Sequence, residues 1–105
     1  MLENTKLDDF IVEELKNNLE HEDIFMEEVI NQFNETQNPK IILSALRHLA
    51  KAEGVSNVAK KTGLTRETFY KALSVKGNPR MDTLFSILKA LGCKFSIAFN
   101  NHKHA

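Results

Sequence analysis

The segment "VAKKTGLTRETFYKAL" and its flanking residues carry many side chains that can bind nucleic acid. A guanidinium group can donate two hydrogen bonds to O6 and N7 of guanine, which reads a base in the major groove. Lysine, serine, threonine, asparagine and tyrosine can hold phosphates, which positions a protein on DNA without reading its sequence. The predicted DNA-binding residues are Ser56, Asn57, Lys60, Lys61, Thr65, Arg66, Glu67, Thr68, Tyr70, Lys71, Lys76, Asn78 and Arg80.

The chemistry of the central residues predicts their separate roles. Arg66 is the expected base-reading residue, and Lys71 reaches either a base or a phosphate. Glu67 either accepts a hydrogen bond from N4 of cytosine or pairs with Lys71, four residues further along a helix. Thr65 is the expected N-cap of its helix and a second candidate for a phosphate contact. Tyr70 either contacts a phosphate through its hydroxyl or packs at an edge.

Other residues in the set are expected to contact only the DNA backbone. Ser56 and Asn57 open a short helix, and the free N–H groups of that first turn can hold a phosphate. Further backbone contacts are predicted for Lys60, Lys61, Lys76, Asn78 and Arg80.

Two short helices, over residues 56–62 and 66–73, must position these side chains. Ala59 is small where the second helix would cross the first. Gly63, four residues later, tolerates the positive φ that the turn needs. The pattern predicts a helix-turn-helix, with the second helix in the major groove. Its expected inward residues are Val58, Leu64, Phe69, Ala72 and Leu73.

Helical apolar spacing extends over most of the remaining chain. Asn38 and Pro39 are the predicted N-cap and first residue of a helix that ends near Gly54. Another helix begins at Met81 or Asp82, and Gly92 ends it. The expected inward residues are Leu7, Phe10, Ile11, Leu15 and Leu19, then Phe25, Val29, Ile30 and Phe33, then Ile42, Leu46, Leu49 and Ala50, and finally Leu84, Leu88 and Leu91.

The apolar period changes after Gly92. In "CKFSIAF", Phe95, Ile97 and Phe99 point one way and the intervening residues the other, which predicts a β-strand. A lone strand leaves its backbone groups unpaired. The same strand of a second copy, related by a two-fold axis, is the simplest partner and predicts a homodimer. Residues 1–6 or a short C-terminal turn are the alternative partners.

The net charge of zero hides a strong asymmetry along the chain. Residues 1–38 contain eleven acidic and two basic residues, a net charge of −9, whereas residues 39–105 have a net charge of +9. The basic part is a candidate surface for a polyanion. The acidic part is either a surface for a basic protein or a face that only confers solubility.

Catalytic and metal-binding motifs are not found in the sequence. "GNPR" has neither the setting nor the lysine of a phosphate-binding loop. Cys93, the single cysteine, is expected to be a buried apolar residue. A metal would bind His102 and His104 only weakly in a terminal tail, and His21 and His48 are expected at surface or boundary positions. We therefore expect no enzyme, metal or cofactor, and the absence of a signal peptide or long apolar run favours a cytoplasmic location.

A family resemblance covers about residues 40–99 and is carried by "LRHLAKAEGVSNVAKKTGLTRETFYKALSVKGNPRMDTLFSILKALGCKFSI". This run resembles the antidote (antitoxin) proteins of bacterial addiction modules, of the HigA-like type within the Cro/CI-type helix-turn-helix class. The resemblance implies a lambda-repressor-like five-helix DNA-binding core, repression of the module's own promoter, and a small toxin, typically RNA-cleaving, as partner. It places the family's DNA-contact positions on Ser56, Thr65, Arg66, Glu67, Tyr70 and Lys71.

The sequence as a whole predicts a mainly α protein in three parts. These are an acidic helical region over residues 1–38, a helix-turn-helix DNA-binding domain over 39–92, and a dimerisation strand with a tail over 93–105. The leading hypothesis is an antitoxin that neutralises a small basic toxin and binds an inverted-repeat operator in double-stranded DNA as a homodimer. Two alternatives stay open: a phage-repressor-like regulator without a toxin, and an interaction module whose helix-turn-helix no longer binds DNA.

Overall fold

The computed structural model describes residues 5–100, which fold into an all-helical domain. No strand is present in this part of the chain. The elements are α1 (Lys6–Asn17), the 3-10 turn η1 (Leu19–His21), α2 (Glu22–Thr36), α3 (Pro39–Glu53), α4 (Val55–Thr62), α5 (Arg66–Leu73) and α6 (Met81–Ala90).

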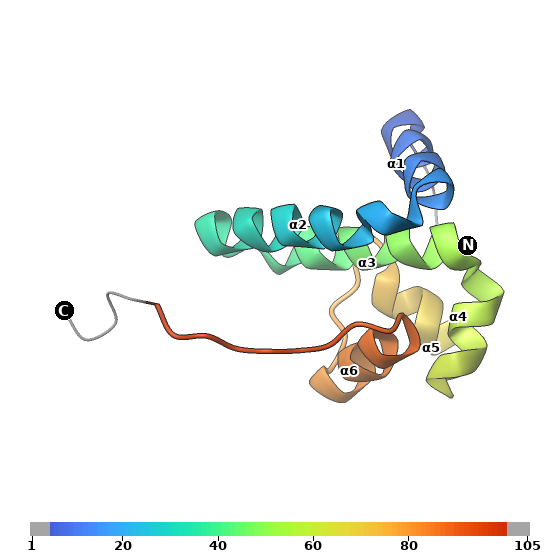
Figure 1. Ribbon diagram of the computed structural model, residues 1–105. Coiled ribbons are helices and arrows are strands. Elements are labelled where there is room, and N and C mark those ends of the chain that lie inside the picture. The colour runs from blue at the N-terminus through green and yellow to red at the C-terminus, as the bar shows by residue number, and fades with distance from the viewer. Residues whose placement is uncertain (1–4, 101–105) are drawn as a thin grey trace.

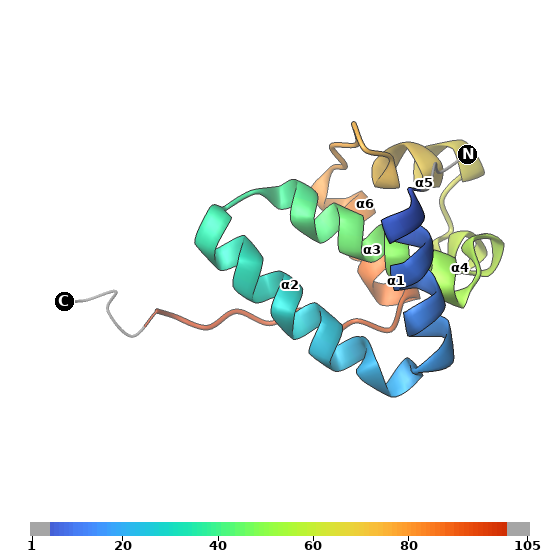
Figure 2. The same ribbon diagram turned by 90° about the horizontal axis from the view of Figure 1, so that it is seen from above.

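Helix α3 lies in the middle of the fold. It contacts α1 and α2 on one side and α4 and α5 on the other (Figures 1 and 2). The predicted start of this helix is confirmed, because Asn38 accepts a hydrogen bond of 3.0 Å from the backbone N–H of Lys40 and Pro39 is the first helical residue. Since both sides of α3 are covered, every residue from Ala45 to Ala50 is buried.

The core joins α3 to the three helices that follow it. Its fully buried large side chains are Leu46, Val58, Phe69, Leu73 and Ile87. The inward residues predicted for α4 and α5 are confirmed, with Leu64 half-buried. In α6 the prediction was incomplete, because Ile87 is the buried residue and Leu84, Leu88 and Leu91 pack against the core from half-buried positions. The α6 segment is therefore rotated from the face that its leucine spacing indicated.

The predicted inward stripe of α1 is partly wrong. Leu7 and Phe10 are 67% and 65% exposed, and Leu19 is also exposed. The predicted burial of Leu15 is confirmed, Ile11 packs against the core from a half-buried position, and Val12, which was not predicted, is also buried. Helix α1 packs mainly on α3, so one narrow edge is covered and the neighbouring apolar side chains stay in contact with solvent. On α2, Val29 is buried, whereas Ile30 is exposed.

Residues 93–100 form an extended arm that leaves the helical body beyond α6 (Figure 1). Phe95 lies 5.3 Å from Phe85 of α6, measured between ring centroids, while Ile97 is 81% exposed. The described residues of this single chain give the arm no strand partner. The β-strand and its pairing across a dimer therefore stay predictions, and the alternative partner segment at the N-terminus lies largely outside the described residues.

Candidate nucleic-acid interface

A turn between α4 and α5 sets the angle of the candidate recognition helix. Gly63 has the left-handed conformation, with φ of 74°, as its position predicted. The hydroxyl of Thr62 donates to the carbonyl of Ala59 at 2.6 Å and accepts from the N–H of Leu64 at 3.1 Å. These local bonds satisfy backbone groups where α4 ends and fix the course of the turn.

Helix α5 begins at a side-chain cap. Thr65 accepts a hydrogen bond of 3.1 Å from the N–H of Thr68, which confirms the predicted N-cap. The hydroxyl of Thr65 also donates to the hydroxyl of Thr68 at 2.8 Å. Both threonines of the predicted DNA-binding set are thus used to start the helix, and their hydroxyls are already engaged within the protein.

The two faces of α5 differ sharply in exposure. Phe69 and Leu73 are fully buried and anchor the helix in the core. Arg66, Glu67 and Lys71 are exposed on the outer face. Within residues 5–100 no ion pair joins Glu67 to Lys71, so the pairing alternative for Glu67 is not realised in this structure. The outer face therefore presents two cations and a carboxylate that do not neutralise each other by direct contact.

Arg66 is held at the front of α5 by two neighbours. Its Nη2 donates to the hydroxyl of Ser56 at 2.9 Å, across from the first turn of α4. Its guanidinium carbon lies 5.7 Å from the centre of the Tyr70 ring, within the range of a cation–π contact. Tyr70 in turn contacts Phe69 edge-on, at 5.9 Å between centroids. Ser56 and Tyr70 thus orient the arginine that is predicted to read a base.

These residues line one open concavity of about 760 Å³. Its wall consists of Lys51, Gly54, Val55, Ser56, Asn57, Arg66 and Tyr70. The structure therefore brings together four predicted residues from the two short helices. Lys61 is separated from this group, because it lines a different concavity with Lys89 of α6.

The loop between α5 and α6 carries three more predicted residues, Lys76, Asn78 and Arg80, all exposed. Its centre is fixed, because Lys40 of α3 donates from Nζ to the carbonyl of Gly77 at 2.6 Å. A Cβ at Gly77 would collide with the backbone carbonyl of Ala72. The end of α5 and the polar loop are thus held in close contact, which requires glycine at this point.

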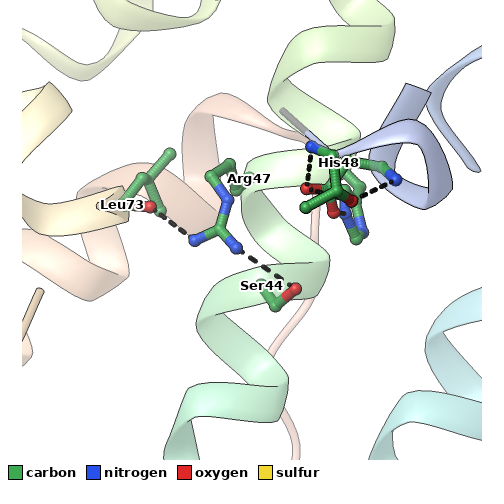
Figure 3. A network of polar contacts seen from close by, with 6 residues as sticks. Ser44, Arg47, His48 and Leu73 are labelled. Carbon is green, nitrogen blue, oxygen red and sulfur yellow. Dashed lines mark hydrogen bonds and ion pairs between the residues drawn. The ribbon is translucent and has the colours of Figure 1, made fainter. Parts of the chain in front are cut away.

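Two polar residues of α3, Arg47 and His48, are buried, and the sequence did not predict this burial. Arg47 donates from Nη1 to the carbonyl of Leu73 at 2.8 Å and from Nη2 to the hydroxyl of Ser44 at 3.4 Å, while its Nε has no hydrogen-bond partner. Figure 3 shows Arg47 and His48 leaving α3 in opposite directions. Because Arg47 satisfies the last carbonyl of α5, it positions the candidate recognition helix from inside the core. The only sequence signal was a pair of polar residues, Arg47 and His48, within an otherwise mainly apolar stretch of α3.

His48 is buried, and the expectation of a surface or boundary position was wrong. Its Nε2 lies 2.6 Å from Oδ1 of Asp8, which joins α3 to the first turn of α1. Asp8 also accepts a hydrogen bond of 2.9 Å from the N–H of Thr5. The Thr5 backbone bond and the His48 contact hold the pKa of the Asp8 carboxyl well below its usual range. We call this contact the Asp8–His48 bond.

Metal and membrane sites were also considered. Residues 5–100 contain no group of three or more histidine, cysteine or acidic side chains placed to hold a metal, and His102 and His104 lie outside that range. Among the described helices, none is long and apolar enough to cross a bilayer.

These features define a small all-helical protein whose fifth helix is anchored in the core and exposes a basic polar face. Residues 6–99 match a family described as "Probable addiction module antidote protein", and the chain belongs to that family. An uncharacterised protein of Haemophilus influenzae is 36% identical over 92 residues, which cover 88% of this chain and 91% of that protein. No solved structure matches the chain. Membership in an antidote family indicates a toxin–antitoxin role, a toxin as partner and a regulatory rather than enzymatic protein.

Proposed function

We propose that this protein is the antitoxin of a type II toxin–antitoxin module. In this proposal it binds an inverted-repeat operator as a homodimer, represses its own promoter and neutralises a small basic toxin by direct contact. The observation that carries the DNA-binding part is the division of α5 into a buried apolar face and an exposed face with Arg66, Glu67 and Lys71. Membership in the antidote family supports the toxin-binding part.

The dimensions of α5 suit the major groove. Eight residues span about 12 Å at 1.5 Å per residue, and the groove of B-DNA is about 12 Å wide. Arg66 is the first helical residue, so a helix that enters the groove with its N-terminus brings the guanidinium to the base edges first. The bond to Ser56 uses one of the five guanidinium donors, which leaves a two-pronged contact with guanine geometrically available.

The extended arm supports the homodimer in this proposal. Phe95, Ile97 and Phe99 alternate along it and are all exposed in the single chain. Pairing with the arm of a second copy would satisfy the backbone and cover these side chains together. Because such a dimer has a two-fold axis, the operator is expected to be an inverted repeat. Its two half-sites should lie about 34 Å apart, one for each recognition helix.

Binding to the DNA upstream of the protein's own reading frame tests the proposal, with fluorescence anisotropy as the measurement. Arg66→Ala should weaken binding to this DNA by about 1–3 kcal/mol and binding to random DNA by much less. Lys60→Ala should weaken binding to both DNAs alike and lower the salt slope by about one unit. Lys16→Ala is the matched control and should leave both affinities unchanged, because this exposed lysine lies on α1, outside the predicted DNA-binding set. Equal losses on both DNAs for Arg66→Ala would reject its base-reading role.

A further inference from the structure

A groove is lined by residues of α1, α2 and α3. Helices α1 and α2 lie on the other side of α3 from α4 and α5 (Figures 1 and 2). The volume of the groove is about 510 Å³. We call it the α1–α3 groove. The apolar side chains that line it are Leu7, Ile11, Phe25, Val29, Ile41 and Ala45. Phe10, next to the groove on α1, is also largely exposed. Exposed apolar side chains beside a groove make this face a candidate contact site for another molecule.

Helices α1 and α2, which form two walls of the α1–α3 groove, lie in the acidic segment of residues 1–38, whose net charge is −9. Glu28 lines the groove, and Glu14 follows Phe10 by four residues on the same face of α1. Two basic side chains, Lys40 and His48, also line the groove, so the excess negative charge lies in the surrounding acidic segment rather than in the lining. Lys40 directs its ammonium group to the carbonyl of Gly77, and the ring of His48 is bonded to Asp8. The groove therefore favours an occupant with apolar anchors and flanking cations.

The three walls of the groove are helices, and this favours a helical occupant over an extended one. Helix backbones have already paired their N–H and C=O groups, so the walls offer no strand edge to an extended chain. The arm of a second copy, with Phe95 and Ile97, would leave its own backbone unpaired in this groove. The same face of a second copy is equally acidic and would be repelled. A basic helix satisfies its own backbone and complements the charge.

We propose that the α1–α3 groove binds a basic amphipathic helix of the toxin. Apolar residues of that helix at positions i, i+4 and i+7 fill the groove, and its lysines or arginines face Glu14 and Glu28. This inference rests on the toxin-binding part of the proposed function and names its site. The groove lies across α3 from Arg66, so the same copy can hold the toxin helix and DNA at once.

Matched variants test the site by titration with the small protein encoded in the neighbouring reading frame. Leu7→Lys and Glu28→Lys should each weaken the complex by about tenfold or more, since loss of a central anchor commonly costs at least that much. Leu19→Lys and Glu20→Lys make the same chemical changes in the acidic segment, outside the groove, and should stay within about twofold of wild type. All four variants should keep wild-type affinity for the upstream DNA.

The outcomes separate the two levels of the proposal. Wild-type binding that Leu7→Lys and Glu28→Lys leave intact would overturn the groove as the toxin site, while the antitoxin function would stand. If the wild type does not bind the second protein, both the groove as toxin site and the antitoxin function are overturned. The DNA-binding part of the proposed function would still stand. A dimer weakened by Leu7→Lys in the absence of the second protein would assign the groove to another copy of this chain.

A direct map of the occupied surface adds an independent test. The probe is a synthetic 18-residue helical peptide with leucines at i, i+4 and i+7 and lysines elsewhere on its flanks. Its addition should shift backbone amide resonances of α1, α2 and the start of α3. The control peptide carries alanines in place of the leucines at equal charge and should produce much smaller shifts. Equal shifts with both peptides, spread over residues 5–36, would indicate charge attraction alone and reject the groove.

Discussion

The substitution Asp8→Ala tests whether one bond holds α1 on the rest of the fold. The Asp8 carboxylate accepts from the N–H and the hydroxyl of Thr5 at the helix cap and contacts Nε2 of the buried His48. Loss of the cap contact costs about 1 kcal/mol. A buried ring nitrogen without a partner costs about 1–3 kcal/mol more. The free energy of unfolding should therefore fall by about 2–4 kcal/mol.

Detachment of α1 sets an upper limit to this loss, because water reaches His48 once the helix leaves. Val12 and Leu15 are the buried anchors of α1, and each contributes about 1.5–3 kcal/mol by burial. When the cost of the unpaired histidine approaches that contribution, α1 opens while the core around Phe69 stays folded. We therefore expect amide hydrogen exchange to accelerate in α1 and to stay slower in α5, where the core around Phe69 remains folded.

Urea denaturation and hydrogen exchange by mass spectrometry measure the two effects. Glu13→Ala removes an exposed acid from the same helix and should change the free energy of unfolding by less than about 0.5 kcal/mol. Asp8→Asn keeps an acceptor oxygen and should cost less than Asp8→Ala. If Asp8→Ala matches Glu13→Ala in stability and leaves exchange of α1 unchanged, the Asp8–His48 bond does not hold the helix.

The same bond predicts a pH dependence with a defined sign. The Asp8 pKa is depressed in the folded protein, so its contribution to stability is complete above the usual aspartate pKa of about 3.9. The contribution is lost as the pH falls below that value, because protonation removes the charge that the folded state stabilises. The stability difference between wild type and Asp8→Asn should therefore shrink on acidification, and a constant difference would contradict the assignment.

Three further substitutions or measurements follow from local geometry. Gly77→Ala should lower the free energy of unfolding by about 1–3 kcal/mol, because the added Cβ would collide with the carbonyl of Ala72. Urea denaturation measures this loss, and a variant as stable as the wild type would refute the clash. Gly63→Ala should cost about 1–2 kcal/mol and Gly63→Asn less in the same assay, since asparagine tolerates the left-handed conformation; equal costs would point to a cause other than φ. Cys93 should react more slowly with iodoacetamide at pH 8 than in the urea-unfolded chain, because burial, followed by nearby carboxylates, raises the pKa of its thiol; equal rates would contradict this.

Local signals in the sequence predicted the helix boundaries well. Asn38 and Pro39 start α3, Thr65 caps α5, and Gly63 has the positive φ of the turn. Each of these features depends on hydrogen bonds or backbone preferences within a few residues, so the residue types are sufficient to predict them. The bounds of α5 were predicted to the residue.

Long-range contacts could not be predicted in the same way. Asp8 and His48 are 40 residues apart, and Arg47 and Leu73 are 26 apart, so no periodicity links them. Apolar spacing identifies a helix face but does not say which neighbour covers it. That is why Leu7 was expected to be buried. The interface group of Ser56, Arg66 and Tyr70 was predicted by type, but the bond that orients Arg66 appears only in the fold.

The central position of α3 connects the proposed toxin and DNA surfaces. It contacts α1 and α2, which form the α1–α3 groove, and also α4 and α5, which carry the DNA-binding candidates. Arg47 ties this helix to the last carbonyl of α5 at Leu73, while His48, the next residue, ties it to α1. Two adjacent residues of α3 therefore link α1 to α5 through side-chain contacts. If toxin binding changes the affinity for DNA, substitution of Arg47 or His48 should alter that change, measured as the ratio of DNA affinities with and without toxin.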